Sequence, residues 1–84
     1  MNATEELHQR IHSWVLDTFP LARQNGIGVD DQLLDGGIID SMGTLEVVQF
    51  IEDEFSVTVE DEEMVADHFS SVRAIADYIQ SKLS

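Results

Sequence analysis

The sequence predicts an all-α fold, a small four-helix bundle with a long first loop and a short third helix. Four segments carry apolar residues at helical spacing, and the runs with β-strand character are too short to build a sheet. The chain has 84 residues and no cysteine, so packed helices rather than disulfides must stabilise it. We therefore expect residues 1–84 to form a single domain.

The first helix is predicted from about Thr4 to Thr18. Its apolar face, on which Trp14 is interpreted as core, follows the i, i+4, i+7 spacing and comprises Leu7, Ile11, Trp14, Val15 and Thr18. Asn2 with Glu5 three residues later, or Thr4 itself, could cap this helix. Pro20 lies just beyond its end, where it is a usual stop signal.

A long connection is expected from about Phe19 to Asp40. It contains four glycines, but it carries too much apolar surface for a free linker, namely Leu21, Ile27, Val29, Leu33, Leu34 and Ile38. Loops of this length in compact domains normally have a function or pack on the core. We expect this one to lie across the helices, with a helical turn around Asp31–Leu34.

The second helix is predicted from Ser41 to Phe55 and has two distinct faces. At about 100° per residue, one face collects Thr44, Val47, Val48, Ile51 and Phe55. The opposite face carries Met42, Glu46, Gln49 and Asp53, with Leu45 and Phe50 on the flanks.

The remaining segments are shorter. Residues 57–59 should be extended, and the acidic run that begins at Glu60 should lead into a short third helix ending near Ala66. Ser70 or Ser71 is a good cap for the last helix. The buried stripe of that helix is predicted to comprise Val72, Ile75, Ala76, Ile79 and Leu83.

Acidic side chains dominate the surface charge. Seventeen acidic residues against four basic ones give a formal net charge of -13. Such a surface repels nucleic acid and anionic membranes and favours partners with basic patches. The acidic N-terminus is unlike a signal or transit peptide, and no apolar run could span a bilayer. We expect a cytoplasmic protein that neither binds nucleic acid nor inserts into membranes.

The most informative residues are those around Ser41, which two glycines and a short apolar step place at a helix start. The N–H groups and dipole of a helix start favour a phosphate esterified to that hydroxyl. A plainer interpretation is that Asp40 or Ser41 only caps the helix. Neither residue has a capping-box partner, and Gly43 costs about 1 kcal/mol relative to alanine. We interpret Gly43 as room for another protein's backbone beside the serine.

Other arrangements of chemical groups are weaker. Ser41 lacks a base, because nothing fixes His8, His12 or His68 beside it and no Gly-x-Ser-x-Gly motif is present. We therefore expect no enzyme. His8 and His12 have a metal-binding spacing but no third ligand. The acidic stretch 30–35 suggests a calcium loop, but with Gly36 as the loop glycine Leu33 and Met42 would fall at ligand positions. No metal site is predicted.

The stretch from Asp40 to Phe55 resembles the second helix of acyl carrier proteins. That helix reads Asp-Ser-Leu and then alternates aliphatic and acidic residues before an acidic cluster closed by Phe. Leu33 to Gly37 is similar to the family's approach to the serine, and Ser70 to Ile79 is similar to its final helix. The resemblance covers about residues 30–84, whereas the first helix agrees only in length and periodicity.

The resemblance implies an acyl-carrier-type fold and a carrier without catalytic activity. Ser41 would receive 4′-phosphopantetheine from coenzyme A through a Mg²⁺-dependent transferase, and Asp40 would help to present it. The thiol of the arm would carry an acyl or aminoacyl group as a thioester. Partners would be the phosphopantetheinyl transferase, an acyl- or aminoacyl-activating ligase and a downstream synthase or transferase. They would bind a monomer through the exposed stripe formed by Met42, Glu46, Gln49 and Asp53.

Two questions stay open from the sequence. Asp-Ser-Met-Gly-Thr looks more like stand-alone carriers of D-alanine or other amino acids, or dedicated lipid and natural-product carriers, than general fatty-acid carriers. The cargo is therefore undecided, and the apolar loop residues could line a space that shelters it or belong to the core. The rival function is an unmodified acidic interaction module that uses the same helix face for binding alone.

Overall fold

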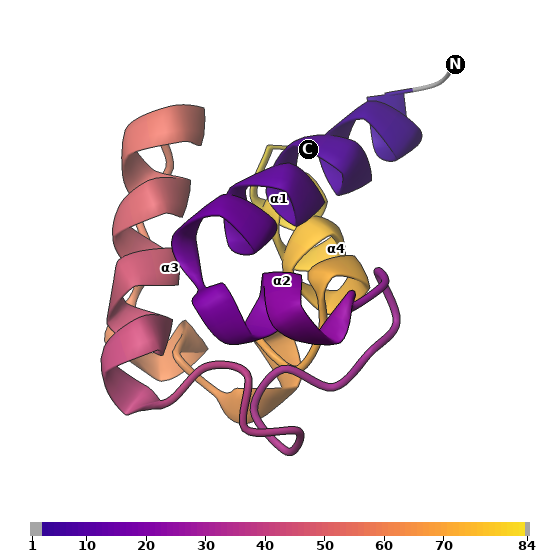
Figure 1. Cartoon of the computed structure of the whole chain (residues 1–84). Coiled ribbons are helices and arrows are strands. Elements are labelled where there is room, and N and C mark those ends of the chain that lie inside the picture. The colour runs from indigo at the N-terminus through magenta and orange to yellow at the C-terminus, as the bar shows by residue number, and fades with distance from the viewer. Residues whose placement is uncertain (1–2, 84) are drawn as a thin grey trace.

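The computed structural model describes residues 3–83 and confirms the all-α fold (Figure 1). No β-strand occurs within these residues. The elements in chain order are α1 (Ala3–Thr18), α2 (Pro20–Asn25), α3 (Ser41–Phe55), the 3₁₀ turns η1 (Asp61–Glu63) and η2 (Ala66–His68), and α4 (Val72–Leu83). The cap predicted at Asn2 lies outside the described residues. Thr4 lies inside α1 rather than at its cap, because the helix begins at Ala3.

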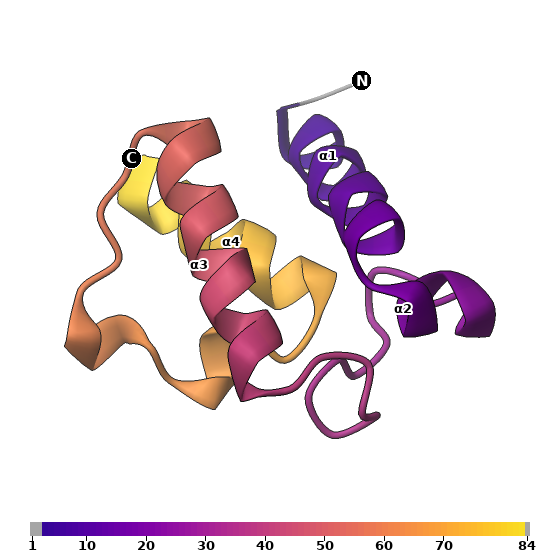
Figure 2. The same ribbon diagram turned by 60° about the vertical axis from the view of Figure 1, so that its left-hand side comes forward.

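The helix α1 packs against α4, and α3 runs antiparallel to α1 along one side of the molecule (Figures 1 and 2). Contacts along the seam between α1 and α3 show this direction. Arg10, Trp14 and Phe19 follow one another along the chain, and they lie against Phe55, Phe50 and Gly43 respectively. Aromatic side chains therefore fill much of the space between these two helices.

The core is apolar and draws on every long helix. Its largest fully buried side chains are Ile11, Val15, Leu33, Val47, Ile51, Phe69, Val72, Ile75 and Ile79. The predicted faces of α1, α3 and α4 therefore supply most of it. Leu83 is a correction, because it ends α4 and is 56% exposed. Trp14 is a second one, since it is half-buried against the core rather than inside it.

The helix α2 was not predicted. Pro20 stops α1 as expected, but it is also the first residue of a new helix, a position that suits its fixed φ and its missing N–H. Gly26 ends α2 in the left-handed conformation, with φ +57°, and its N–H bonds back to the carbonyls of Ala22 and Arg23. The buried Ala22 anchors this short helix to the core.

The rest of the connection lies across the helices, as predicted. The N–H of Leu33 donates to the carbonyl of Ser70 at 2.7 Å, and the N–H of Arg73 donates to that of Val29 at 2.9 Å. Arg73 also forms an ion pair with Asp30. The helical turn expected at Asp31–Leu34 is wrong, because the turn falls three residues later, over 34–37. There Gly37 adopts φ +73°, which favours glycine.

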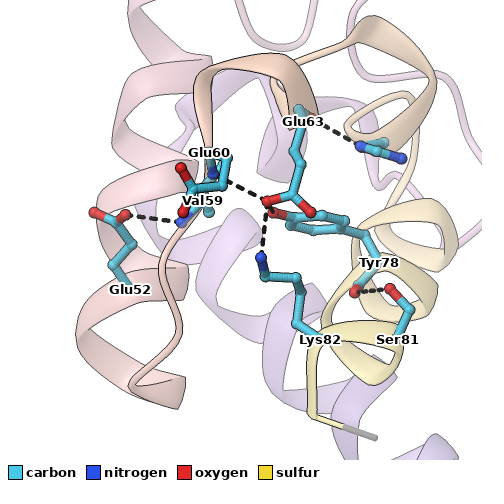
Figure 3. A network of polar contacts seen from close by, with 8 residues as sticks. Glu52, Val59, Glu60, Glu63, Tyr78, Ser81 and Lys82 are labelled. Atoms are coloured by element: carbon cyan, nitrogen blue, oxygen red, sulfur yellow. Dashed lines mark hydrogen bonds and ion pairs between the residues drawn. The ribbon is translucent and has the colours of Figure 1, made fainter.

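The predicted short third helix occurs as two separate 3₁₀ turns rather than as one helix ending near Ala66. Glu60 and Glu63 form a capping box around η1, and Val65 is extended before η2 begins. The Glu63 carboxylate accepts hydrogen bonds from Lys82 Nζ at 2.8 Å and from the Tyr78 hydroxyl at 3.2 Å (Figure 3). These bonds fasten η1 to α4, and they favour a tight turn over a continuing helix.

Candidate functional site

Ser41 is the first residue of α3 and is exposed. Asp40, not Ser41, is the helix cap: its Oδ1 accepts the N–H of Gly43 at 2.8 Å. The carbonyl of Asp40 accepts the N–H of Thr44 at 2.9 Å, which closes the first turn. The capping interpretation is thus confirmed for Asp40, and the fold assigns the cap bond to the neighbour of Ser41.

Two of the glycines near Ser41, Gly36 and Gly43, leave no room for a side chain, because other parts of the same chain pack against them. A Cβ added to Gly43 would lie 3.0 Å from Phe19 Cε1 and 3.1 Å from Ile39 Cβ. The interpretation that Gly43 leaves room for another protein is therefore wrong, because Gly43 is buried and its space belongs to α1 and the loop. At Gly36 an added Cβ would meet the carbonyl oxygen of Gln32 at 2.4 Å.

A largely apolar cavity of about 550 Å³ adjoins Ser41. It is lined by Leu34, Ile39, Asp40, Ser41, Thr44, Leu45, Met64, Val65, Ala66 and Phe69. The loop thus contributes Leu34 and Ile39 to this cavity, and Ile39 also belongs to the core, together with Ile27 and Leu33. Sequence reasoning missed the wall after η1. The short apolar run of residues 64–66, directly after the acidic run of residues 60–63, is the sequence signal that could have found it.

The predicted stripe lies on one exposed face of α3. Met42 is 74% exposed, and Glu46, Gln49 and Asp53 follow at steps of four, three and four residues on the same side. Gln49 Nε2 donates to Asp53 Oδ1 at 3.0 Å and so orients that carboxylate. The structure therefore brings all four stripe residues together, on the same helix as Ser41.

Glu63 directly precedes Met64, the first residue of the segment 64–66 that lines the cavity, and its carboxylate is bonded to α4. Hydrogen bonding from Lys82, then from the Glu60 N–H and the Tyr78 hydroxyl, lowers the pKa of the Glu63 carboxyl. Burial, followed by the charge and hydrogen bond of Glu63, raises the pKa of Tyr78 to about 12. Glu63 is thus a charged anchor at neutral pH, and Tyr78 is its neutral donor.

The histidines make contacts away from Ser41. His12 Nε2 donates to the carbonyl of Ile27 at 2.6 Å, and His68 Nδ1 donates to that of Glu63 at 2.7 Å. His8 Nε2 is buried without a hydrogen-bond partner. Among the described residues, no group of three or more His, Cys, Asp or Glu side chains could hold a metal ion.

The site around Ser41 fits a covalently attached phosphate ester. Its hydroxyl is exposed at the positive end of a 15-residue helix, and the adjoining cavity is open to a group carried on an arm. Asp40 already uses the Gly43 N–H, so a phosphate on Ser41 would share this helix end with a carboxylate.

An exposed serine at a capped helix start, on a small acidic all-α fold, is the arrangement that a covalent carrier protein requires. The family model described as phosphopantetheine attachment site matches residues 10–79, and the chain belongs to that family. The prediction of a carrier family with covalent 4′-phosphopantetheine, rather than an enzyme family, is thereby confirmed.

One protein with a similar sequence is the D-alanyl carrier protein of Streptococcus mutans serotype c (strain ATCC 700610 / UA159). The two chains are 35% identical over 51 residues, which is 61% of this chain and 65% of that relative. The similarity therefore spans somewhat less than two thirds of the relative's length. None of the helices in residues 3–83 combines the length and apolarity that crossing a membrane requires.

Proposed function

We propose that Ser41 bears the 4′-phosphopantetheine arm and that this protein presents groups carried on it as thioesters to partner enzymes. The position of Ser41 carries the proposal, since it is exposed at the first residue of α3 while Asp40 supplies the cap. The match to the phosphopantetheine attachment family supports an attached arm, and the matched range 10–79 includes Ser41. Asp40 then has two roles: it holds the first turn, and it places a carboxylate beside the hydroxyl for the transferase.

Intact-mass measurement after incubation with coenzyme A, Mg²⁺ and a broad-specificity phosphopantetheinyl transferase tests this proposal. One phosphopantetheine should add to the chain, and Ser41→Ala should abolish the addition. Ser13→Ala is the matched control, because Ser13 is also an exposed helical serine and should leave the addition intact. An unmodified chain, or a label on another residue, would instead support an acidic interaction module.

For the cargo, we propose an aminoacyl group, with D-alanine as the first compound to test. The D-alanyl carrier relative and the Asp-Ser-Met-Gly-Thr sequence support this choice. A fatty acyl group is the second candidate, and the apolar cavity of about 550 Å³ beside Ser41 supports it. Loading the modified protein with alanyl and with octanoyl groups separates the two, because only an acyl chain that enters the cavity should shift the NMR signals of Leu45 and Val65.

The proposed partners are the transferase, an acyl- or aminoacyl-activating ligase and a downstream synthase or transferase. Basic patches on these enzymes would bind the stripe of Met42, Glu46, Gln49 and Asp53, whose exposure and negative charge suit such patches. We place the protein in the cytoplasm as a monomer. Strong like charge opposes association of two copies, and size-exclusion chromatography with light scattering would measure it.

A further inference from the structure

The seam between α1 and α3 already holds one arginine. The guanidinium carbon of Arg10, on α1, lies 5.6 Å from the ring centre of Phe55, on α3, and the same guanidinium pairs with Glu54. A planar cation over an aromatic ring with a carboxylate beside it combines two favourable contacts. This intramolecular contact shows that the seam between α1 and α3 can bind a guanidinium group between an aromatic ring and a carboxylate.

The next helical turn of the seam presents the same chemical groups again. Trp14 lies four residues after Arg10 and stacks on Phe50, with ring centres 4.3 Å apart and planes 13° from parallel. Both rings are only half-buried. They line a groove of about 530 Å³ together with Thr18, Glu46, Gln49, Asp53 and Glu54. The described residues that line this groove include three carboxylates and no lysine or arginine.

The chain's own basic side chains pair with carboxylates other than Glu46 and Asp53, and one of them, Arg10, pairs with Glu54, which also lines the groove. The sequence contains four lysine and arginine residues. Each pairs with a carboxylate other than those of Glu46 and Asp53, the pairs being Arg10–Glu54, Arg23–Asp17, Arg73–Asp30 and Lys82–Glu63. A lysine or arginine that neutralises Glu46 and Asp53 must therefore come from another molecule. A second copy of this chain is a poor source, because it carries the same net charge of -13.

We propose that the groove formed by Trp14, Phe50, Glu46 and Asp53 binds one arginine side chain of a partner enzyme. The guanidinium would lie against the aromatic pair and donate hydrogen bonds to both carboxylates. Arginine is favoured over lysine because its plane stacks on aromatic rings and its several N–H groups reach two acceptors at once. The inference rests on the proposed function for the identity of the partner, and it extends the docking surface from α3 onto α1.

Trp14 makes the groove directly observable, because it is the only tryptophan in the chain. The probes are capped pentapeptides of glycine with a central arginine, lysine or citrulline, titrated at low salt while Trp14 fluorescence is recorded. The arginine peptide should change the fluorescence saturably, with a dissociation constant about threefold below that of the lysine peptide. The neutral citrulline peptide should give no saturable change. Equal responses to arginine and lysine, or none to arginine, would overturn the proposal.

Paired variants separate the groove from general charge attraction. The double variant Glu46→Gln/Asp53→Asn should weaken the arginine peptide about fivefold. The control Asp61→Asn/Glu62→Gln also removes two negative charges, but from η1, which lies on the other side of α3 from α1 (Figure 2). It should change the affinity for the arginine peptide by less than about twofold. If both double variants weaken binding of the arginine peptide equally, net charge alone explains the effect and the groove proposal is refuted.

A second measurement on the same protein samples distinguishes failure of the groove proposal from failure of the proposed function. Each variant is also exposed to coenzyme A and the transferase, and its mass is measured. A chain that is modified at Ser41 but shows no arginine-specific response refutes the groove alone. A chain that binds the arginine peptide but is never modified refutes the carrier proposal and leaves the groove as a binding site.

Discussion

At the scale of single residues, three neighbours at the start of α3 have separate roles. Asp40 makes the cap bond, Ser41 is exposed, and Gly43 is pressed against Phe19 and Ile39. The sequence located this turn, but it could not tell which side Gly43 faces. Its inward role depends on the path of Phe19, which belongs to a connection whose course no local pattern reveals.

We predict that Gly43→Ala destabilises the fold, against the usual effect of this change inside a helix. Alanine is better than glycine by about 1 kcal/mol in helix propensity. The new Cβ would lie 3.0 Å from the Phe19 ring and 3.1 Å from Ile39 Cβ, where overpacking costs about 1–3 kcal/mol. Urea unfolding followed by circular dichroism should show a net loss. Gly28→Ala is the control, because its added Cβ meets nothing closer than 3.9 Å, and a more stable Gly43→Ala would contradict the packing explanation.

A second residue-scale prediction concerns Tyr78, the only tyrosine in the chain. Its ultraviolet absorbance after rapid pH jumps should titrate near pH 12, since burial and Glu63 raise its pKa to about 12 from 10.0. Between those two values the folded chain keeps a proton that the unfolded chain loses, so unfolding free energy should fall as pH rises through this window. Glu63→Gln should lower the Tyr78 midpoint. An unchanged midpoint would show that Glu63 does not act on Tyr78.

At the scale of elements, periodicity predicted the three long helices and missed the short pieces. α1, α3 and α4 each repeat an apolar face over at least three turns, which makes the pattern clear. The six residues of α2 are too few for a repeat, and Pro20 serves as both stop and start. The η1 and η2 turns depend on Glu63 reaching α4 across the fold, a contact that the local sequence does not contain.

The candidate site was predictable to a similar extent. Ser41, Asp40 and the stripe follow from one motif and one helical wheel, and the structure places them on one end and one face of α3. The groove beside Trp14 was not predictable, because it requires the α1 and α3 faces to meet at an angle that only tertiary packing fixes.

The stripe on α3 gives an element-scale prediction. Glu46→Lys and Asp53→Lys should each slow the association of a phosphopantetheinyl transferase with the apo protein, by about tenfold at low salt, because they oppose a basic docking patch. Stopped-flow kinetics would measure the rates. Glu62→Lys on η1 is the matched control and should have a smaller effect. Equal slowing by all three variants would assign the effect to net charge rather than to the stripe.

At the scale of the whole molecule, acidic residues far outnumber basic ones, with 17 aspartate and glutamate residues against four lysine and arginine residues. Arg73–Asp30 ties the long connection to α4, and Lys82–Glu63 ties η1 to the same helix. The remaining carboxylates repel one another across a body that extends 33 by 32 by 20 Å. Self-repulsion at this charge destabilises a compact state.

We therefore predict that sodium chloride stabilises this protein. At about 0.1 M salt the Debye length is about 10 Å, so repulsion across the molecule is screened more than the contacts of paired side chains. The urea midpoint should rise between low salt and about 0.5 M sodium chloride. Asp61→Asn/Glu62→Gln should show a smaller rise because it carries less charge. A midpoint that falls with salt would mean that the ion pairs outweigh the repulsion.

The first turn of α3 has one more consequence. Asp40 makes its cap bond and Gly43 its tight packing contacts, so neither of these two interactions depends on the side chain of the exposed Ser41. A group joined to that side chain can be added, exchanged and removed without refolding the turn. On the proposed function, the arm on Ser41 could be loaded and unloaded repeatedly while the first turn of α3 keeps its cap bond and its packing.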